Sequence, residues 1–217
     1  MGAAHDALAT RLEAALLSLD RAEVGATFAA IAGPDTIDRV TLADSVIAPA
    51  LLSIGQAWDE GSAALSQVYM AGRLVEEALE RHLPAAPPRP GAPRIGVAVL
   101  EDHHSLGKRI VCAVLNSAGY DVRDLGSGLD AVTLVDRALE QQVDLLMVSV
   151  LMLNRALRVS LVRQQLSERD AHHVTLVVGG APFVHDPELY RRVGADRCGR
   201  SAADALRIAA AYEGGER

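Results

Sequence analysis

The sequence is poor in aromatic residues and cysteines. Aromatic side chains make up 3% of its 217 residues, whereas hydrophobic residues make up 50%, so any core has to be built from Ala, Val and Leu. Its two cysteines, Cys112 and Cys198, are too few for a disulfide framework. We interpret both as small buried hydrophobic residues, Cys112 in an apolar helical run and Cys198 near the end of a strand.

Basic surface and long apolar runs are also lacking. The formal net charge is −7 and the arginines are scattered singly or in pairs, which excludes the basic patch typical of nucleic-acid-binding modules. The N-terminus has no basic segment followed by an apolar stretch, and no uninterrupted apolar run reaches about 18 residues. We therefore expect a cytoplasmic protein without an export signal or transmembrane helix, which binds neither nucleic acid nor membrane.

The clearest domain boundary is a proline-rich segment at residues 84–93. Its five prolines prevent regular structure and favour a stiff, extended linker. Residues 1–83 carry apolar side chains at helical spacing without a convincing strand, which predicts a helical-bundle cap domain. The expected helices cover 4–20, 21–32, a segment capped by Asp35 or Thr36, a segment beginning at Pro49, and 62–83.

After the linker, residues 94–217 alternate short apolar runs with helical segments. The expected strands are 94–100, 121–125, 144–150, 174–178 and a weak fifth at 195–198. Near-continuous apolar strands alternating with helices predict a parallel sheet with helices on both faces. Because crossovers between parallel strands are right-handed, we expect an α/β fold with a flavodoxin-like, doubly wound sheet of five strands. Asn154 is expected to cap the helix after the third strand.

Ligands in such sheets bind beyond the carboxyl ends of the strands, where the first and third strands meet. The loop after the first expected strand carries Asp102, His104 and Gly107. A carboxylate that accepts a hydrogen bond from one ring nitrogen of a histidine fixes the tautomer and makes the other nitrogen a better metal ligand. Gly107 permits close backbone approach where the next helix begins.

Two further loops should face this one. Ser149 ends the third strand and supplies a hydroxyl that can donate or accept a hydrogen bond. Gly179 and Gly180 end the fourth strand and leave a gap without side chains that a bulky group could occupy. Together the three loops predict a metal ligand beside a slot for a large planar or extended cofactor.

These loops resemble the cobalamin-binding signature DxHxxG…SxL…GG. Its fixed positions are filled here, in the same order, by Asp102, His104, Gly107, Ser149, Leu151, Gly179 and Gly180. The neighbouring runs GYDVRDLG, VDLLMVSVLM and VVGGAPF are similar to the family as well. Residues 94–217 therefore resemble the B12 domains of methionine-synthase-like and corrinoid-carrier proteins.

The resemblance implies how cobalt would be held. His104 would be the lower axial ligand, in place of the cofactor's own dimethylbenzimidazole. His103 would be an idle neighbour, with the alternative that it is the ligand instead. Asp102 would hydrogen-bond the His104 imidazole, and Ser149 would extend that network or contact the displaced nucleotide tail.

The resemblance also implies a channel for that tail. Gly179 and Gly180 would line the channel, with Leu151 and Gly126 nearby. Leu153 departs from the family, whose members often carry a Thr four residues after the Ser. That departure removes one polar contact to the cofactor without abolishing binding.

The helical half resembles, more loosely, the four-helix cap that precedes the B12 domain in this family and covers the upper cobalt face. The match rests on residues 54–61 and 65–71. Trp58 and Tyr69 would shield the upper ligand, and a place in the ordinary bundle core is the alternative for each.

The function implied is that of a corrinoid methyl carrier, which binds methylcobalamin or another corrinoid. Because the chain has no separate catalytic domain, it would be the carrier subunit of a cobalamin-dependent methyltransferase system rather than a complete enzyme. Its partners would be a substrate:corrinoid methyltransferase and a corrinoid:acceptor methyltransferase, with a reductive activator as a further candidate.

The main alternative is a B12-dependent light or ligand sensor or regulatory protein. Photoreceptors of that kind carry a Glu-His pair ten and eleven residues after the Trp, where this chain has Val68 and Tyr69. No DNA-binding module is evident before the cap either. A mutase role would need a large barrel domain supplied by another subunit. We therefore favour the carrier.

Two other readings of the site fit less well. A phospho-acceptor receiver domain needs an Asp at the end of the third strand, where this chain has Ser149, and a Lys after the fifth, where it has Cys198. A zinc site would need converging ligands, but His172 and His173 precede the fourth strand, at the opposite end of the sheet from His104.

Overall fold

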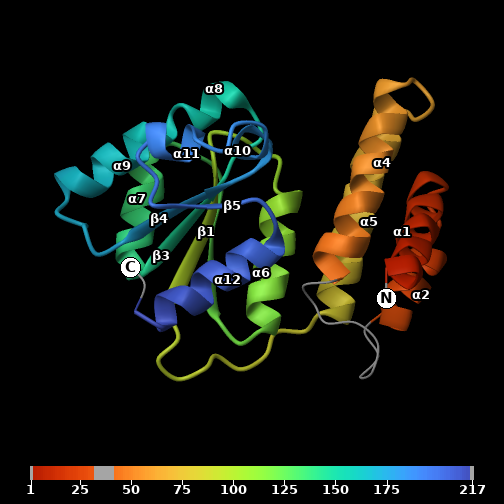
Figure 1. Ribbon diagram of the computed structural model, residues 1–217, viewed down its shortest axis with the longest axis horizontal. Helices are drawn as coiled ribbons and strands as arrows, with labels where there is room; N and C mark the ends of the chain where they lie inside the picture. Colours follow the sequence, from red (N-terminus) through yellow and green to blue (C-terminus); the bar gives the residue numbers. More distant parts are fainter. Residues whose placement is uncertain (1, 32–41, 216–217) are drawn as a thin grey trace. The chain divides into compact units, whose positions relative to one another are not determined.

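The computed structural model describes residues 2–31 and 42–215, and it divides into two compact units, Met1–Pro84 and Ala85–Arg217 (Figure 1). The first unit is helical. Its elements are α1 (Gly2–Leu17), α2 (Arg21–Ile31), the π-helix η1 (Ala43–Ile47), α4 (Ala48–Asp59) and α5 (Leu65–His82). None of the helices in the described ranges combines the length and apolar composition that a membrane-spanning helix needs.

The helices of the first unit bury the apolar side chains that recur at spacings of three and four residues. The largest fully buried side chains of this unit are Phe28, Leu12, Leu16, Leu42, Ile47 and Ile54. Each contributes about 1.5–3 kcal/mol when it is removed from water. The helical bundle expected for this half is therefore observed.

Pro49 lies at the start of α4 (Ala48–Asp59), as predicted, but no break separates α4 from the helical turn before it. The helical backbone runs from Leu42 through η1 into α4, and the Ala48 N–H donates to the Ala43 carbonyl across the wide π turn. Pro49 lies in the first turn of α4, where its missing N–H costs little. The caps expected at Asp35 or Thr36 lie outside the described residues.

The second unit has a five-stranded parallel sheet in the order β2-β1-β3-β4-β5, which confirms the flavodoxin-like prediction. Its strands are β1 (Arg94–Leu100), β2 (Asp121–Leu129), β3 (Leu145–Ser149), β4 (Thr175–Gly179) and β5 (Arg197–Gly199). The helices are α6 (Leu106–Ser117), α7 (Ala131–Glu140), α8 (Leu153–Ala156), α9 (Val159–Glu168), α10 (Ala181–His185), α11 (Leu189–Arg192) and α12 (Ala202–Glu213).

Helices cover both faces of this sheet (Figure 1). On one face Ile95 and Val97 of β1 belong to a core cluster that includes residues of α6 and α12. On the other face Ala98 and Leu100 pack in a cluster with residues of α7 and α9. Since alternate strand residues point to opposite faces, both sets of side chains are buried and the strand is apolar throughout.

Two predicted elements differ from those observed. β2 extends to Leu129 instead of ending at residue 125, because two register shifts against β1 let the chain bulge and continue. The helix after β3 is broken into α8 and α9, and Asn154 lies inside α8 rather than at its cap, which is Met152.

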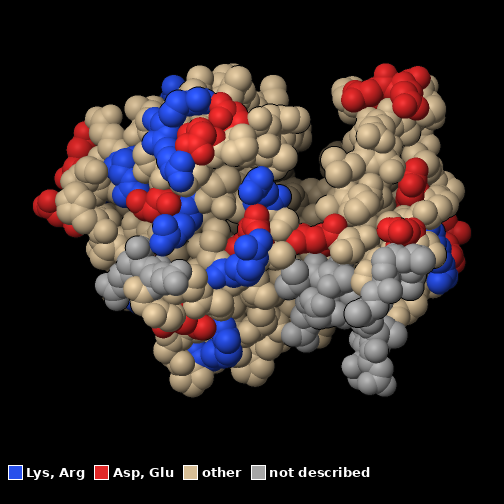
Figure 2. Space-filling model, in the orientation of Figure 1, with Lys and Arg blue, Asp and Glu red and all other residues tan. Residues whose placement is uncertain are grey.

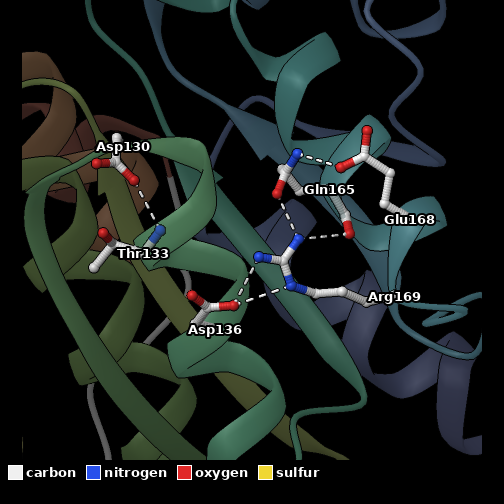
Figure 3. A network of polar contacts seen from close by, with 6 residues as sticks. All are labelled: Asp130, Thr133, Asp136, Gln165, Glu168 and Arg169. Atoms are coloured by element: carbon white, nitrogen blue, oxygen red, sulfur yellow. Dashed lines mark hydrogen bonds and ion pairs between the residues drawn. The ribbon is translucent and has the colours of Figure 1, made fainter.

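A polar network joins α7 to α9 on the outer side of the sheet (Figure 3). The Arg169 guanidinium donates to Asp136 of α7 at 3.0 Å and to the Gln165 carbonyl of α9 at 3.2 Å. Asp130 caps α7 by accepting the Thr133 N–H at 2.8 Å. These contacts fix the register of two helices that lie on the same face.

The proline-rich segment has no helix or strand, as predicted, but it packs against the second unit. The Arg89 N–H donates to the Gly119 carbonyl at 2.8 Å, and its guanidinium lies 4.4 Å from the centre of the Tyr120 ring. The same guanidinium pairs with Glu213 of α12 at 3.0 Å. Most of the segment therefore belongs to the second unit, which begins at residue 85.

Charges are mixed on the face of the second unit seen in Figure 2, where Lys and Arg alternate with Asp and Glu. In the first unit, acidic side chains gather where α4 ends, at Asp59 and Glu60. Most of the arginines form exposed ion pairs, each of which contributes about 0–1 kcal/mol.

Candidate functional site

The carboxyl ends of β1, β3 and β4 lie side by side. Val99 is in register with Ser149, and Ser149 with Gly179. The loops that follow these three strands therefore meet at one edge of the sheet, as the sequence predicts for a ligand site at the switch point.

The first of these loops holds a histidine bonded to a carboxylate. Asp102 Oδ1 lies 2.5 Å from His104 Nδ1, and it also accepts the N–H groups of His103 at 2.6 Å and His104 at 3.1 Å. The Asp102 side chain is 9% exposed, whereas that of His104 is 69% exposed. With the proton held at Nδ1, Nε2 is left with a lone pair at the surface, which is what a metal ligand requires.

Two opposing effects act on the pKa of Asp102. Burial raises it, but the hydrogen bonds from the His104 ring and from the N–H groups of His104 and His103 lower it by more, so the pKa lies below its ordinary value. Asp102 is therefore ionised at neutral pH and acts as an acceptor only. Its second oxygen, Oδ2, is buried and has no hydrogen-bond partner within the described residues, so it is free to accept a further donor.

Ser149 and Gly107 lie next to each other. A Cβ added to Gly107 would have Ser149 Oγ as its nearest neighbour, at 3.9 Å, which is ordinary contact. The Ser149 hydroxyl thus sits beside the first turn of α6. No neighbouring atom of the described chain crowds the Cβ position of Gly107, and close approach of a ligand there stays a prediction.

The two glycines where β4 ends, Gly179 and Gly180, are packed against main chain. A Cβ on Gly179 would lie 2.7 Å from the Gly199 carbonyl oxygen, and one on Gly180 would lie 1.9 Å from that of Val150. The space that a side chain would take is therefore filled by neighbouring strand ends, not left as the open gap predicted. Their lining of a tail channel stays a prediction.

The other predicted residues are spread over both units. Gly126 lies in the bulged end of β2 with a φ of +112°. Leu151 and Leu153 are exposed in the segment after β3. Trp58 of α4 and Tyr69 of α5 are exposed on the first unit, so neither belongs to its core.

Two charge clusters near the site were not predicted from the sequence. Glu101 accepts from Arg155 at 2.8 Å and from Arg158 at 2.7 Å, which ties the end of β1 to α8 and α9. The other cluster is an ion pair between the buried Lys108 and the exposed Asp124. A signal for it existed, since Lys108 lies three, four and seven residues before apolar positions of α6 and so falls on its buried face.

The metal-binding groups of the site suit a metal ion that is already coordinated by a macrocycle. Within the described ranges, no group of three or more His, Cys, Asp or Glu side chains could hold a metal ion. A single imidazole with a free Nε2 is enough for the cobalt of a corrinoid, whose macrocycle supplies the other nitrogens. The buried Asp102 Oδ2 offers an acceptor for the same ligand or for Ser149. These residues therefore fit such a group.

Comparison with known proteins agrees with this fit. A family model described as a B12 binding domain matches residues 94–210, and a second, also described as a B12 binding domain, matches residues 8–82. The chain is 31% identical over 176 residues to trimethylamine corrinoid protein 1 of Methanosarcina acetivorans, covering 78% of this chain and 81% of that protein. It is 30% identical over 190 residues to trimethylamine corrinoid protein 1 of Methanosarcina mazei, covering 85% and 87%.

Solved structures show the same fold. The monomethylamine corrinoid protein of Methanosarcina barkeri superposes with a TM-score of 0.80 at 20% identity, covering 95% of this chain and 99% of that one. A cobalamin-binding protein from Desulfitobacterium hafniense DCB-2 gives a TM-score of 0.53 at 21% identity, covering 93% and 96%. The helical half and the α/β half thus occur together in other chains.

Proposed function

The chain belongs to the B12-binding domain family, and on that premise we propose that it is a corrinoid protein that carries methyl groups for a cobalamin-dependent methyltransferase system. The predicted resemblance to B12 domains is confirmed, and the cofactor it implies is a cobalt corrinoid. Relatives named as methylamine corrinoid proteins support the carrier over the sensor.

One observation supports the position of the cofactor above all others. It is the hydrogen bond between Asp102 and His104, which leaves His104 Nε2 free at the carboxyl edge of the sheet. In this proposal His104 Nε2 is the lower axial ligand of cobalt. Asp102 keeps the proton at Nδ1 and holds the ring in one orientation, which raises the basicity of Nε2.

When bound, the corrinoid supplies a cobalt centre that can accept and release a methyl group. The chain's own residues bind and orient it. The Ser149 hydroxyl lies beside the start of α6, where it can donate to the displaced tail or to the network around Asp102. Gly126, Leu151, Gly179 and Gly180 are proposed to line the tail channel, with Trp58 and Tyr69 covering the upper face.

A methyl carrier needs one methyltransferase that loads it and one that unloads it. We propose both as partners, together with a reductive activator. Methylated amines are the first donors to test, because trimethylamine and dimethylamine corrinoid proteins are among the relatives that match most of this chain.

The test of the cobalt ligand is reconstitution with hydroxocobalamin and methylcobalamin in the dark, followed by removal of free cofactor. Wild type should retain cobalamin with the visible spectrum of a base-off, histidine-bound corrinoid. His104→Ala should lose that spectrum, and Asp102→Asn should weaken retention about 10–100-fold, as loss of a partner of a metal-bound histidine does.

His103→Ala is the matched control, because His103 is the neighbouring residue and its hydrogen bond to Asp102 is donated by its backbone N–H, which alanine keeps. Its spectrum should equal that of wild type. If His103→Ala lost the histidine-bound spectrum and His104→Ala kept it, the ligand assignment would be wrong. Retention of no corrinoid by wild type would refute the proposed function.

A further inference from the structure

Lys108 is the only lysine in the sequence, since each of the other 20 basic residues among its 21 Lys and Arg is an arginine. It is the third residue of α6 and four residues after His104. Its side chain is only 5% exposed. The single lysine of the chain therefore stands at a buried position, where it provides a compact ammonium on a flexible stem, which arginine does not.

The buried ammonium has one carboxylate partner. Lys108 Nζ lies 2.5 Å from Oδ1 of Asp124, a residue of β2 whose side chain is 56% exposed. The same oxygen accepts the N–H of Gly126 at 2.8 Å. One carboxylate oxygen therefore links α6 to the point where β2 leaves its regular register with β1.

A second cation holds the same stretch of backbone. Arg137 of α7 donates to the Leu125 carbonyl at 2.7 Å, and a Cβ on Gly126 would lie 2.9 Å from its guanidinium. The bulged end of β2 is thus fixed from α6 by Lys108 and from α7 by Arg137. The two cations bind at Asp124 and Leu125, successive residues of the irregular strand end. A regular parallel ladder is held by its backbone hydrogen bonds and does not need such contacts.

This strand end in turn holds the loop of the candidate site. The N–H of Gly128 donates to the Asp102 carbonyl at 2.7 Å, and the Leu129 carbonyl accepts the N–H of Glu101 at 2.9 Å. Asp102 carries the hydrogen bond that orients His104. A shift of the strand end therefore moves the backbone on which the Asp102–His104 pair is built.

Stability alone does not account for a buried ammonium at this place. Only the Lys108 side of the pair is buried, and because an ammonium must be taken out of water there, an apolar side chain of similar volume is often neutral or stabilising at such a position. Lys108 precedes Val111, Cys112 and Leu115 of α6, which pack in the core, by three, four and seven residues, so an apolar residue such as methionine or leucine would be expected at its position. What the ion pair adds is a direct link between α6, which begins two residues after His104, and the end of β2.

We propose that Lys108 is a positioning residue for the axial histidine: through Asp124 it fixes the end of β2, which fixes the backbone of Asp102 and so the direction of His104 Nε2. The proposal rests on the proposed function, because it takes His104 as the cobalt ligand. Lys108 acts only through these residues and has no contact with the cofactor assigned to it.

The experiment compares Lys108→Met, which keeps an unbranched apolar stem without the charge, with wild type. Three quantities are measured: amide hydrogen exchange of Gly128 in the apo-protein, the Kd for hydroxocobalamin, and the fraction of reduced cobalt that shows nitrogen coupling from His104 by electron paramagnetic resonance. Lys108→Met should exchange the Gly128 amide about tenfold faster, bind cobalamin about tenfold more weakly and lower the histidine-bound fraction.

Arg123→Met is the matched control. Arg123 lies on the same strand, next to Asp124, and its ion pair with Asp121 at 2.8 Å is exposed and faces away from α6. It should leave all three quantities at their wild-type values. Lys108→Met/Asp124→Leu removes both charges together, so it carries the same test should Lys108→Met unfold. Its stability should recover, while the exchange of Gly128 and the histidine-bound fraction should not.

The proposal is overturned if Lys108→Met, or the double variant, keeps the wild-type exchange at Gly128 and the full histidine-bound fraction. It is also overturned if the double variant recovers the histidine-bound fraction along with its stability, since Lys108 would then act through stability alone. Failure of wild type to bind any corrinoid refutes the proposed function instead, and that outcome is seen in wild type before any variant is compared.

Discussion

The substitution Gly180→Ala tests the packing of the strand ends that form the candidate site. Gly180 has a φ of +114° and a ψ of 174°, a combination that only glycine adopts readily. Its Cβ would lie 1.9 Å from the Val150 carbonyl oxygen, far inside the 3.4 Å at which ordinary contact begins. Because the obstacle is main chain, no side chain can turn aside, and the ends of β3 and β4 have to separate.

The expected loss of stability is the sum of three effects. The backbone conformation costs about 1–3 kcal/mol for a residue with a Cβ. Overpacking costs about 1–3 kcal/mol. The hydrogen bond from the Val150 N–H to the Gly179 carbonyl, 3.0 Å long, is lost at about 1 kcal/mol. The total of about 3–7 kcal/mol is comparable with the whole stability of a domain, about 5–15 kcal/mol.

Urea unfolding followed by circular dichroism measures this loss, with Gly91→Ala as the matched control. Gly91 belongs to the same unit and has a φ of +80°, but nothing lies within 4 Å of its Cβ position. Gly91→Ala should cost only the backbone strain, about 1–2 kcal/mol. At low urea, Gly180→Ala should also retain less cobalamin than wild type, because the strand ends that form the candidate site are disturbed.

The two variants separate collision from strain. If Gly180→Ala lost no more stability than Gly91→Ala, the collision with Val150 would have no energetic consequence. Gly180 would then be required for its conformation alone, and the explanation given for the paired glycines would be refuted.

Three further predictions concern charged and titrating groups. The pKa of Asp102 lies below its ordinary value of 3.8, so the contribution of this carboxylate to stability is present above about pH 4 and is lost as the pH falls through the lowered pKa. In Asp102→Asn, the unfolding free energy should therefore fall less steeply with decreasing pH in this acid range. Burial, and then the charge of Arg81, lower the pKa of His82, so its neutral form stabilises the first unit above pH 6.5, and that stability is lost as the pH falls towards the lowered pKa. Urea unfolding followed by the fluorescence of Trp58, the only tryptophan in the sequence, should show this loss. His82→Gln should abolish the pH dependence. Glu101→Gln removes the carboxylate that pairs with Arg155 and Arg158 and should lower the unfolding free energy by about 1–3 kcal/mol, with a larger loss at low salt than at 1 M salt. An equal loss at both salt concentrations would show that Coulomb attraction between these groups is not its cause.

Much of the fold could be predicted from the order of the residues. β1 was expected over residues 94–100 and lies there, because its unbroken apolar run has to be buried on both faces. The strand order followed from the right-handedness of crossovers, which leaves few arrangements for five βα units. The residues of the candidate site were named from the same source, since a signature of fixed spacing fell at the ends of the predicted strands.

Where prediction failed, the cause was a contact between residues distant in the sequence. β2 continues to Leu129 because bulges form against β1. The proline segment is held by Arg89, whose partner Glu213 is 124 residues away, and no local pattern records that pairing.

The glycines after β4 and the lysine of α6 show the same division at the site. Glycine at 179 and 180 and lysine at 108 can be read from the sequence, and so can the family that the glycines indicate. That Gly180 is needed because a carbonyl of β3 fills its side-chain position, and that Lys108 reaches Asp124, emerged only when α6, β2, β3 and β4 were packed together. Residue types and their spacing determine which chemistry is present, whereas the close packing of distant segments decides which atoms meet.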